Sequence, residues 1–198
     1  MLGSSLKEAS VKHILKANKL IKQCQMHNIS LYFPKLDIQK IKVRCYGDAS
    51  FGKLADGGSQ GGMYIELISS QNKSAPIAWQ SKRICRVVNN IMSAETLAMK
   101  DALDTGFLVK YLLDELLYEG KNKVPIEGLT DSKALHEASH STTSVQDRRL
   151  RIDLSIIREY ILNEKCKLSW VESGDQLADI LTKEGVDSLK ILSHISRN

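Results

Sequence analysis

Short runs of alternating apolar and polar residues occupy the middle of the chain and predict strands. Alternation with a period of two puts every second side chain on the same face, which is typical of a sheet with one face against a core. Turn residues separate the first three runs, so these three predict an antiparallel meander. The predicted strands cover residues 41–46, 63–69, 76–82, 126–129 and 166–171.

Apolar residues at helical spacing follow the third strand and recur towards the end of the chain. They predict a long helix over residues 93–118, with Ser93 as its N-cap and Gly120 near its end. Further helices are predicted from residue 132, over 149–162 and from 175. The element order is therefore β-β-β-α-β-α-α-β-α, which predicts an α/β fold.

The first 40 residues differ in pattern from the rest. Apolar side chains at helical spacing predict a short amphipathic helix, and an extended piece broken at Pro34 follows it. This part contains no recognisable chemistry. We predict a helix and connection segment at 1–40, one domain at 41–185 and a tail at 186–198. The apolar positions of the predicted helix are Val11, Ile14, Leu15, Leu20 and Ile21.

Composition limits the classes of protein that fit. The chain has 198 residues, of which 42% are hydrophobic and 26% charged, enough for one well-buried core. A net charge of +5 favours an anionic partner, although it is lower than in dedicated nucleic-acid binders. No apolar run approaches the roughly 20 residues that cross a bilayer, and the first residues lack the apolar core of a signal peptide. We therefore expect an intracellular protein, cytoplasmic or nuclear, without a membrane partner.

The four cysteines are far apart and form no Cys-x-x-Cys pair, which argues against a zinc site and a disulfide scaffold. We expect all four to be buried, reduced thiols. They are Cys24, Cys45, Cys85 and Cys166.

A glycine-rich stretch at residues 52–62, GKLADGGSQGG, contains five of the 12 glycines. A phosphate-binding loop would need Gly-Lys-Ser/Thr at the head of a helix, and the stretch lacks it. The glycines instead predict a flexible hairpin between the first two strands.

Four acidic residues fall where a predicted strand meets a predicted helix. Each alone has a simpler interpretation: a turn residue, a charge near a helix N-terminus, an N-cap or part of a solvated helix face. Together they are carboxylates without Cys or His partners, the oxygen ligands that Mg²⁺ or Mn²⁺ prefers. The shared pattern predicts a cation site formed by Asp48, Glu95, Asp131 and Asp179.

The sequence around these acids resembles the ribonuclease H domain of copia-type LTR retrotransposon polyproteins. The matching pieces are YGDAS, SAETLA, TDSKAL and DQLADILTK, and the resemblance covers residues 42–183 in order. It implies an RNase H-like fold, a mixed five-stranded sheet with helices on both faces. The segment up to residue 40 resembles the end of the connection between polymerase and nuclease. A reverse transcriptase domain upstream in a parent polyprotein is thus an implied partner, because the chain itself lacks a Tyr-x-Asp-Asp signature.

The resemblance also implies an activity: divalent-metal-dependent endonucleolytic hydrolysis of the RNA strand of RNA–DNA hybrids. Two cations, Mg²⁺ or Mn²⁺, stabilise charge on the attacking and leaving oxygens of such a reaction. By this resemblance Asp48 is the bridging ligand, Glu95 and Asp131 bind the cation nearer the attacking water, and Asp179 binds the other.

Two kinds of side chain are candidates for substrate contacts. Ser50 and Ser132 match small polar positions that approach the nucleic-acid backbone in this family, with hydroxyls suited to phosphate or 2′-OH groups. Two basic clusters are candidates for phosphates of the paired strand, with a solvated basic face as the alternative. They comprise Lys82, Arg83 and Arg86, and Arg148, Arg149 and Arg151.

One departure from the family pattern concerns the loop after the last strand. Many ribonucleases H have a histidine there that helps proton transfer, whereas this chain reads WVESGDQLAD. His136 and His140 do not match that position, and Glu172 is a candidate substitute. Loss of such a group typically lowers a rate by a factor of about 10² to 10⁴, so a slow enzyme is expected.

Two other classes of protein remain as alternatives. One is a catalytically silent binding or structural module from a decayed or domesticated retrotransposon, against which the presence of all four carboxylates argues. The other is a transposase or integrase of the same broad fold. Such enzymes carry the glutamate on a late helix, and Glu95 lies on an early one.

Overall fold

The computed structural model describes residues 10–26, 30–69, 73–143, 145–183 and 194–195. The chain divides into two compact units, Met1–Leu31 and Tyr32–Asn198. In the first unit, helix α1 (Val11–Met26) has no buried residue, and its apolar side chains are exposed. The amphipathic helix predicted near the N-terminus is therefore present.

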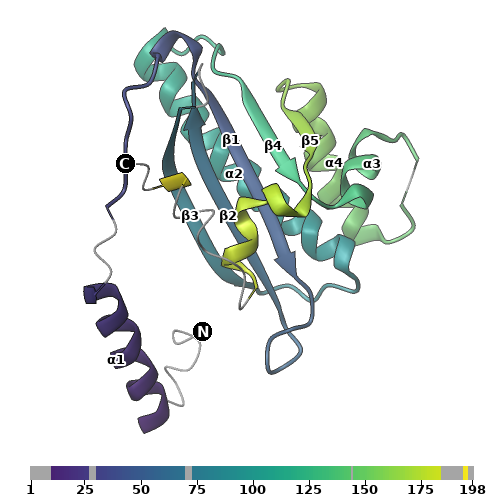
Figure 1. Ribbon diagram of the computed structural model, residues 1–198. Coiled ribbons are helices and arrows are strands. Elements are labelled where there is room, and N and C mark those ends of the chain that lie inside the picture. The colour runs from purple at the N-terminus through teal and green to yellow at the C-terminus, as the bar shows by residue number, and fades with distance from the viewer. Residues whose placement is uncertain (1–9, 27–29, 70–72, 144, 184–193, 196–198) are drawn as a thin grey trace. The chain divides into compact units, whose positions relative to one another are not determined.

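The second unit is built on one mixed sheet of five strands (Figure 1). The strand order is β3-β2-β1-β4-β5. The first three strands form an antiparallel meander, and β4 and β5 extend the sheet in parallel from β1. This is the mixed five-stranded sheet that the sequence predicts. The strands are β1 (Lys42–Ser50), β2 (Ser59–Ile68), β3 (Ser74–Ile84), β4 (Ile126–Thr130) and β5 (Lys167–Trp170).

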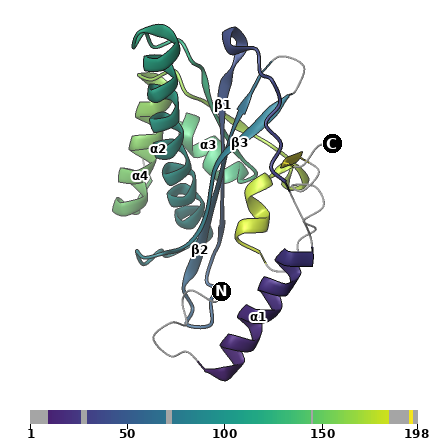
Figure 2. The same cartoon turned by 90° about the vertical axis from the view of Figure 1, so that its left-hand side faces the viewer.

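Helices lie on both sides of the sheet (Figure 2). Helices α2 and α4 cover one side, and the segment that contains the 3₁₀ helix η5 lies on the other. No described helix is both long enough and apolar enough to span a bilayer. The helical elements of this unit are η2 (Ile38–Lys40), α2 (Ile91–Tyr118), α3 (Lys133–His140), α4 (Arg148–Leu162), η4 (Ser173–Asp175) and η5 (Leu177–Leu181).

Alternation along β1 creates the two packed faces. Val43 and Cys45 belong to the main core, which includes Met99 and Leu103 of α2. Tyr46 belongs to a second core on the opposite face, together with residues of η5. Because side chains alternate along a strand, Asp48 lies on the same face of β1 as Tyr46.

Two glycines allow α2 to approach β1 closely. A Cβ atom at Gly47 would lie 2.7 Å from the Cα atom of Met99, and one at Gly106 would lie 2.1 Å from the Sγ atom of Cys45. Both distances are shorter than any ordinary contact, so larger side chains would force the helix away from the strand. The close approach brings the start of α2, with Glu95, beside the end of β1.

Several predicted boundaries were wrong in ways that affect the site. Strand β1 continues to Ser50, so Asp48 lies within the strand and pairs with Gly62 rather than ending a run. Helix α2 begins at Ile91, and the side chain of Asn90 caps it, so the predicted N-cap Ser93 lies inside the helix and Glu95 in its second turn. The closing helix predicted from residue 175 consists of 3₁₀ turns as far as the structure describes it.

The cysteine prediction was correct for two residues only. Cys45 and Cys166 are buried, whereas Cys24 and Cys85 are exposed. Cys24 lies on α1, none of whose residues is buried, and Cys85 directly follows the end of β3. The glycine-rich hairpin is confirmed for residues 51–58, which join β1 to β2, but Gly61 and Gly62 lie within β2 and not in the turn.

Candidate active site

Three of the four predicted carboxylates meet at one end of the sheet. Asp48 comes from β1, Asp131 directly follows β4, and Asp179 is the third residue of η5. One carboxylate oxygen from each lies within 4.8 Å of the other two. Oxygen ligands at this spacing are suited to a hard divalent cation.

Glu95 borders this cluster from α2 and is 7% exposed. Its Oε2 atom is buried without a hydrogen-bond partner among the described residues. Burial, and then the charges of Asp48 and Asp131, raise the pKa of Glu95 to about 9. A buried carboxylate with an unsatisfied oxygen is costly unless a proton or a cation neutralises it. Glu95 therefore adds a fourth carboxyl group, one oxygen of which is unsatisfied among the described residues, beside the acidic cluster.

Asp48 lies at the centre of the site, with 1% of its surface exposed. Burial is the main cause that raises its pKa to about 6, and the charges of Asp179 and Asp131 add to the increase. A hydrogen bond from the Thr182 hydroxyl and the nearby ammonium group of Lys183 act in the opposite direction. The site thus holds more negative charge than its own side chains neutralise.

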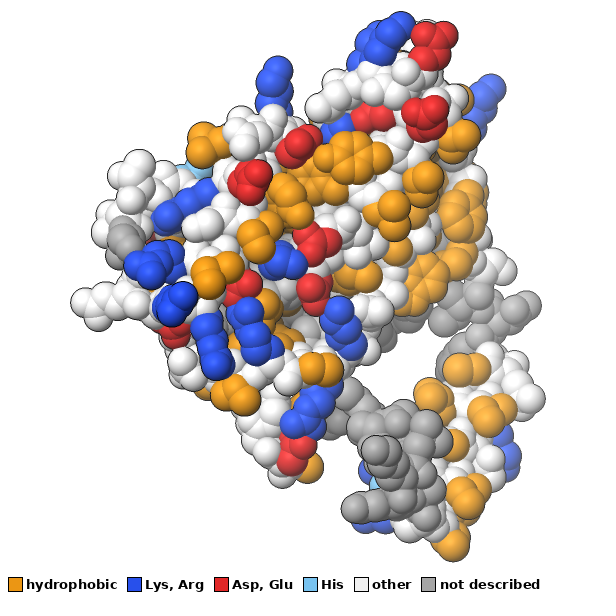
Figure 3. Space-filling view, turned by 180° about the vertical axis from the view of Figure 1, so that it is seen from behind, with side chains coloured by type: hydrophobic (Ala, Val, Ile, Leu, Met, Phe, Trp, Pro, Cys, Tyr) orange, Lys and Arg blue, Asp and Glu red, His pale blue; other side chains and the backbone are white. Residues whose placement is uncertain are grey.

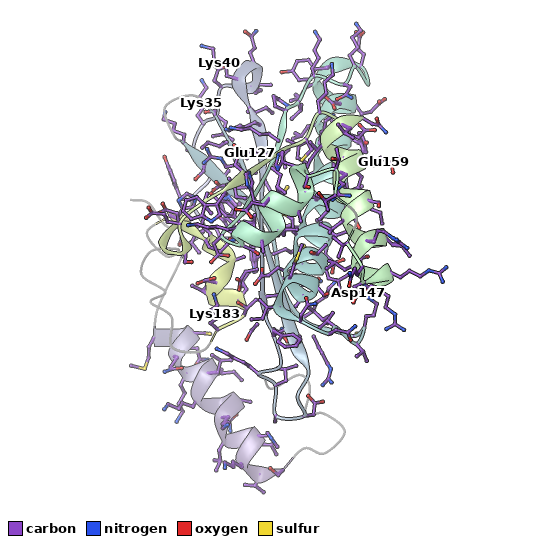
Figure 4. The ribbon with its side chains drawn as sticks, turned by 90° about the vertical axis from the view of Figure 1, so that its right-hand side faces the viewer. Lys35, Lys40, Glu127, Asp147, Glu159 and Lys183 are labelled. Atoms are coloured by element: carbon purple, nitrogen blue, oxygen red, sulfur yellow. The ribbon has the colours of Figure 1, made fainter. Side chains whose placement is uncertain are left out.

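Lys183 is a site residue that the sequence reasoning missed. Its Nζ atom lies 2.7 Å from Oδ1 of Asp179 and 3.5 Å from Oδ1 of Asp48. The labelled side chain lies beside η5 in Figure 4. The ammonium group contacts two of the predicted metal ligands and partly neutralises them. A lysine four residues after Asp179 was the available signal, because this spacing favours an ion pair in a helical segment.

Asp131 is held by residues at the end of β5 and in the loop that follows it. The hydroxyl of Ser173 donates a hydrogen bond of 2.7 Å to Oδ2 of Asp131, and the indole N–H of Trp170 donates one of 3.0 Å to its carbonyl oxygen. Glu172, the candidate substitute for the histidine, is exposed. The loop therefore orients a carboxylate through a serine, a contact that the sequence reasoning missed.

The donor set fits a divalent cation. All four candidate ligands are carboxylates, three of them converge, and the fourth has a buried oxygen that no described residue hydrogen-bonds. The raised pKa values of Asp48 and Glu95 have the same main cause, burial, to which the neighbouring carboxylates add; both effects favour neutralisation by a proton or a cation. The chemistry of these ligands suits Mg²⁺ or Mn²⁺ better than a metal that prefers nitrogen or sulfur.

The first predicted basic cluster is not one surface. Lys82 forms a 2.9 Å ion pair with Asp101 of α2. Arg83 pairs with Asp56 in the hairpin, and Arg86 pairs with Asp153 of α4. Each cation is thus directed to a different element, and the three are partly neutralised.

The second predicted basic cluster lies on the first turn of α4. Arg148, Arg149 and Arg151 are exposed there, and Asp147 caps the helix. The amide of Asn89, just before α2, donates a hydrogen bond to Asp147. This contact links the start of α4 to the segment that precedes Glu95. Figure 3 shows Lys and Arg side chains gathered on part of the helical side of the molecule.

The two predicted serines differ in their surroundings. Ser50 is buried at the end of β1, two residues after Asp48 and therefore on the same face of the strand. Ser132 is the N-cap of α3, and its Oγ atom accepts a hydrogen bond from the backbone N–H of Leu135. Its hydroxyl proton remains available to a substrate, because a serine both accepts and donates.

Comparison with solved structures finds the same architecture in several ribonucleases H. RNase H1 from the archaeon Halobacterium salinarum superimposes with a TM-score of 0.52 at 23% identity, over 74% of this chain and 98% of that chain. LC11-RNase H1, which was isolated from compost and solved in complex with an RNA/DNA hybrid, gives 0.51 at 15% identity, over 75% and 99% of the two chains.

A foamy viral protease–reverse transcriptase in complex with an RNA/DNA hybrid is also similar. Its TM-score is 0.52 at 13% identity, over 79% of this chain and 21% of that much longer chain. No protein-family model matches the sequence, and no curated protein matches it significantly. At these identities the likeness shows the fold alone, and the fold is RNase H-like.

Proposed function

We propose that this chain is a divalent-metal-dependent ribonuclease H that hydrolyses the RNA strand of RNA–DNA hybrids and derives from a copia-type retroelement. The observation that carries the proposal is the convergence of Asp48, Asp131 and Asp179 beside Glu95, whose buried Oε2 has no hydrogen-bond partner in the described part of the chain. The motif resemblance over residues 42–183 supports the retroelement origin, with a reverse transcriptase domain upstream in the parent polyprotein.

The four carboxylates would hold two cations, Mg²⁺ or Mn²⁺. When bound, these cations supply charge stabilisation for the attacking and leaving oxygens of a phosphodiester. The contribution of the protein is to hold the ligands in place: Thr182 donates to Asp48, and Ser173 donates to Asp131. Each hydroxyl binds one oxygen of its carboxylate, and the other oxygen of Asp48 faces the ammonium group of Lys183.

Substrate recognition is proposed to use both serines and the start of α4. Ser50 shares a strand face with Asp48, and Ser132 follows Asp131, so their hydroxyls are suited to a 2′-OH or phosphate beside the carboxylates. Arg148 and Arg149 are exposed and suited to phosphates of the paired strand. Lys82, Arg83 and Arg86 would have to exchange their carboxylate partners for phosphates to contribute.

Cleavage of a labelled RNA–DNA hybrid, with and without Mg²⁺, tests the proposal. Asp48→Asn and Asp131→Asn keep the shape of the side chain but remove a ligand charge, and each should abolish metal-dependent cleavage. Asp37→Asn is the matched control, because Asp37 is a surface N-cap and asparagine also caps helices well. Cleavage that persists in both site variants would contradict the proposal.

A silent RNase H-like binding module is the second candidate. The ion pairs of Lys183 with Asp48 and Asp179 favour it, because they neutralise part of the site without a metal. This candidate predicts that the parent chain binds the hybrid without cleaving it at any Mg²⁺ or Mn²⁺ concentration. Filter binding in parallel with the cleavage assay distinguishes the two.

A further inference from the structure

One buried side chain connects the three segments that carry the converging carboxylates. Gln176 is 4% exposed and lies directly before η5. Its Nε2 group donates hydrogen bonds to the carbonyl oxygens of Gly47 on β1, at 3.1 Å, and Leu129 on β4, at 3.3 Å. Its Oε1 atom accepts a hydrogen bond from the backbone N–H of Ala178, at 3.3 Å.

These contacts lie where β1 and β4 stop pairing. The last residue pair of their parallel ladder is Tyr46 with Leu129. Beyond it the strands lead to Asp48 and Asp131, whose backbones no longer hydrogen-bond to each other in the ladder. The amide of Gln176 bridges the two strands at this fork through both of its N–H groups.

The same side chain also fixes the third segment. By accepting from Ala178, Gln176 caps η5, in which Asp179 is the next residue. An uncapped helix start leaves backbone N–H groups unsatisfied, and a capping side chain defines where the helix begins. One amide therefore contacts the residue before Asp48, the strand that leads to Asp131 and the turn that carries Asp179.

Only a side chain with two donors and an acceptor at this reach can make all three contacts. Glutamine provides them on one amide. Glutamate in its ionised form has no donor, methionine of similar shape has none either, and asparagine is one methylene shorter. The requirement is chemical as well as spatial, because both carbonyl oxygens are buried and need a donor.

We propose that Gln176 is a positioning residue that sets the spacing of Asp48, Asp131 and Asp179, and with it the affinity of the site for divalent cations. This inference rests on the proposed metal-dependent function. Side chains that orient metal ligands typically contribute a factor of about 10 to 100 in metal affinity. The hydrogen bonds described for the Gln176 side chain all go to backbone atoms of the segments that carry the carboxylates, so its replacement should change metal affinity more than hybrid affinity.

The test measures Mn²⁺ binding to the chain by isothermal titration calorimetry, alongside Mg²⁺ titrations of hybrid cleavage. Gln176→Met should weaken Mn²⁺ binding by about tenfold or more and raise the Mg²⁺ concentration for half-maximal cleavage by a similar factor, with little change in KM for the hybrid. Gln176→Asn keeps an amide that can cap η5 but cannot reach both strands, and should show a smaller loss. If the methionine variant does not fold, the asparagine variant decides the question.

Tyr160→Phe is the matched control for the loss of a partly buried hydrogen bond. The Tyr160 hydroxyl donates to Asp104 at 2.6 Å and links α4 to α2 without contacting the carboxylates. This variant should lower thermal stability and leave Mn²⁺ affinity unchanged. A Gln176 variant that behaves like Tyr160→Phe, with lower stability but parental Mn²⁺ affinity, would overturn the inference.

Failure of the proposed function gives a different result. If the parent chain binds Mn²⁺ in a manner that depends on Asp48 but never cleaves the hybrid, the proposed activity is wrong, and the Gln176 variants still test the positioning role. If the parent chain does not bind Mn²⁺ at all, both proposals are overturned.

Discussion

Asp48 on β1 lies directly opposite Gly62 on β2, and the missing side chain of Gly62 makes room for the segment that covers Asp48. A Cβ atom at Gly62 would lie 2.7 Å from Cγ2 of Thr182 and 2.9 Å from Cβ of Leu181. The hydroxyl of Thr182 donates to Asp48, so the contact with Asp48 depends on the glycine across the strand.

Gly62→Ala should therefore disrupt the site. The added methyl group pushes the end of η5 away from the sheet and with it Asp179, so Mn²⁺ affinity should fall by about tenfold. Gly61→Ala is the matched control, because a Cβ there would meet Ile84 at 3.4 Å, an ordinary contact. Calorimetric titration with Mn²⁺ measures both variants, and equal affinities would contradict the prediction.

Glu95→Gln should stabilise the metal-free protein at alkaline pH. The pKa of Glu95 rises from 4.5 to about 9 on folding, so between these values the folded chain retains a proton that the unfolded chain has released. Stability therefore falls as pH rises through this window, and it is unaffected below the lower value, where both states are protonated. Glutamine cannot ionise, so the Glu95→Gln variant does not undergo this loss of stability.

At about pH 8 the gain from Glu95→Gln should be roughly 1–4 kcal/mol, and it should vanish near pH 4.5. Urea denaturation in the presence of EDTA at the two pH values measures it. Adding Mg²⁺ at the higher pH should favour the parent chain instead, since the cation takes the place of the proton. A difference in unfolding free energy between the two proteins that is the same at both pH values would contradict the raised pKa of Glu95.

Lys183→Met should strengthen divalent-cation binding. The ammonium group pairs with Asp179 and Asp48 and so competes with a cation for the same oxygens. Its removal should raise Mn²⁺ affinity by about twofold to fivefold, the scale of a partly exposed ion pair. Lys73→Met, at an exposed position in the turn before β3, is the control and should leave the affinity unchanged. Weaker binding in Lys183→Met would show that Lys183 supports the site rather than competing for it.

The double variant Arg148→Gln/Arg149→Gln should weaken hybrid binding without changing cleavage of bound substrate. Each lost phosphate contact lowers the slope of log affinity against log salt concentration by about 1. Fluorescence anisotropy at several salt concentrations measures the slope, and single-turnover cleavage measures the chemical step. Lys35→Gln/Lys40→Gln removes the same charge near the end of the sheet away from Asp147 (Figure 4) and should have little effect.

The sequence predicted the sheet and the origin of the carboxylates because both depend on local pattern. Alternation in residues 42–46 separates Val43 and Cys45 from Arg44 and Tyr46, and the structure places these pairs on opposite faces. Asp131 follows its strand as predicted, since a short buried strand has clear ends. Asp48 was placed wrongly at a strand end because Gly47 and Ala49 carry no strong strand signal, although β2 pairs with both.

The supporting residues were not predictable in the same way. Ser173 and Gln176 act through contacts with segments far away in sequence, and nothing in their local context distinguishes them from surface polar residues. For Lys183 the spacing from Asp179 was a local signal, but its contact with Asp48 was not predictable in this way. Gly62 was interpreted as part of a flexible hairpin, whereas its role comes from the segment that packs on it. Such roles become visible only when the topology of the fold is known.

The hydrogen bond from Thr182 to Asp48 joins residues that are 134 positions apart in sequence. Cation binding at Asp48 therefore depends on the folding of nearly the whole second unit. The converging carboxylates come from β1, the residue after β4 and η5. All three can bind one ion only after the sheet has formed and η5 has packed against it. A cation that binds the native state alone adds about 2.7 kcal/mol at 100 times its dissociation constant. If the chain binds magnesium as proposed, the local supply of this ion would also affect how long the folded state persists in a cell.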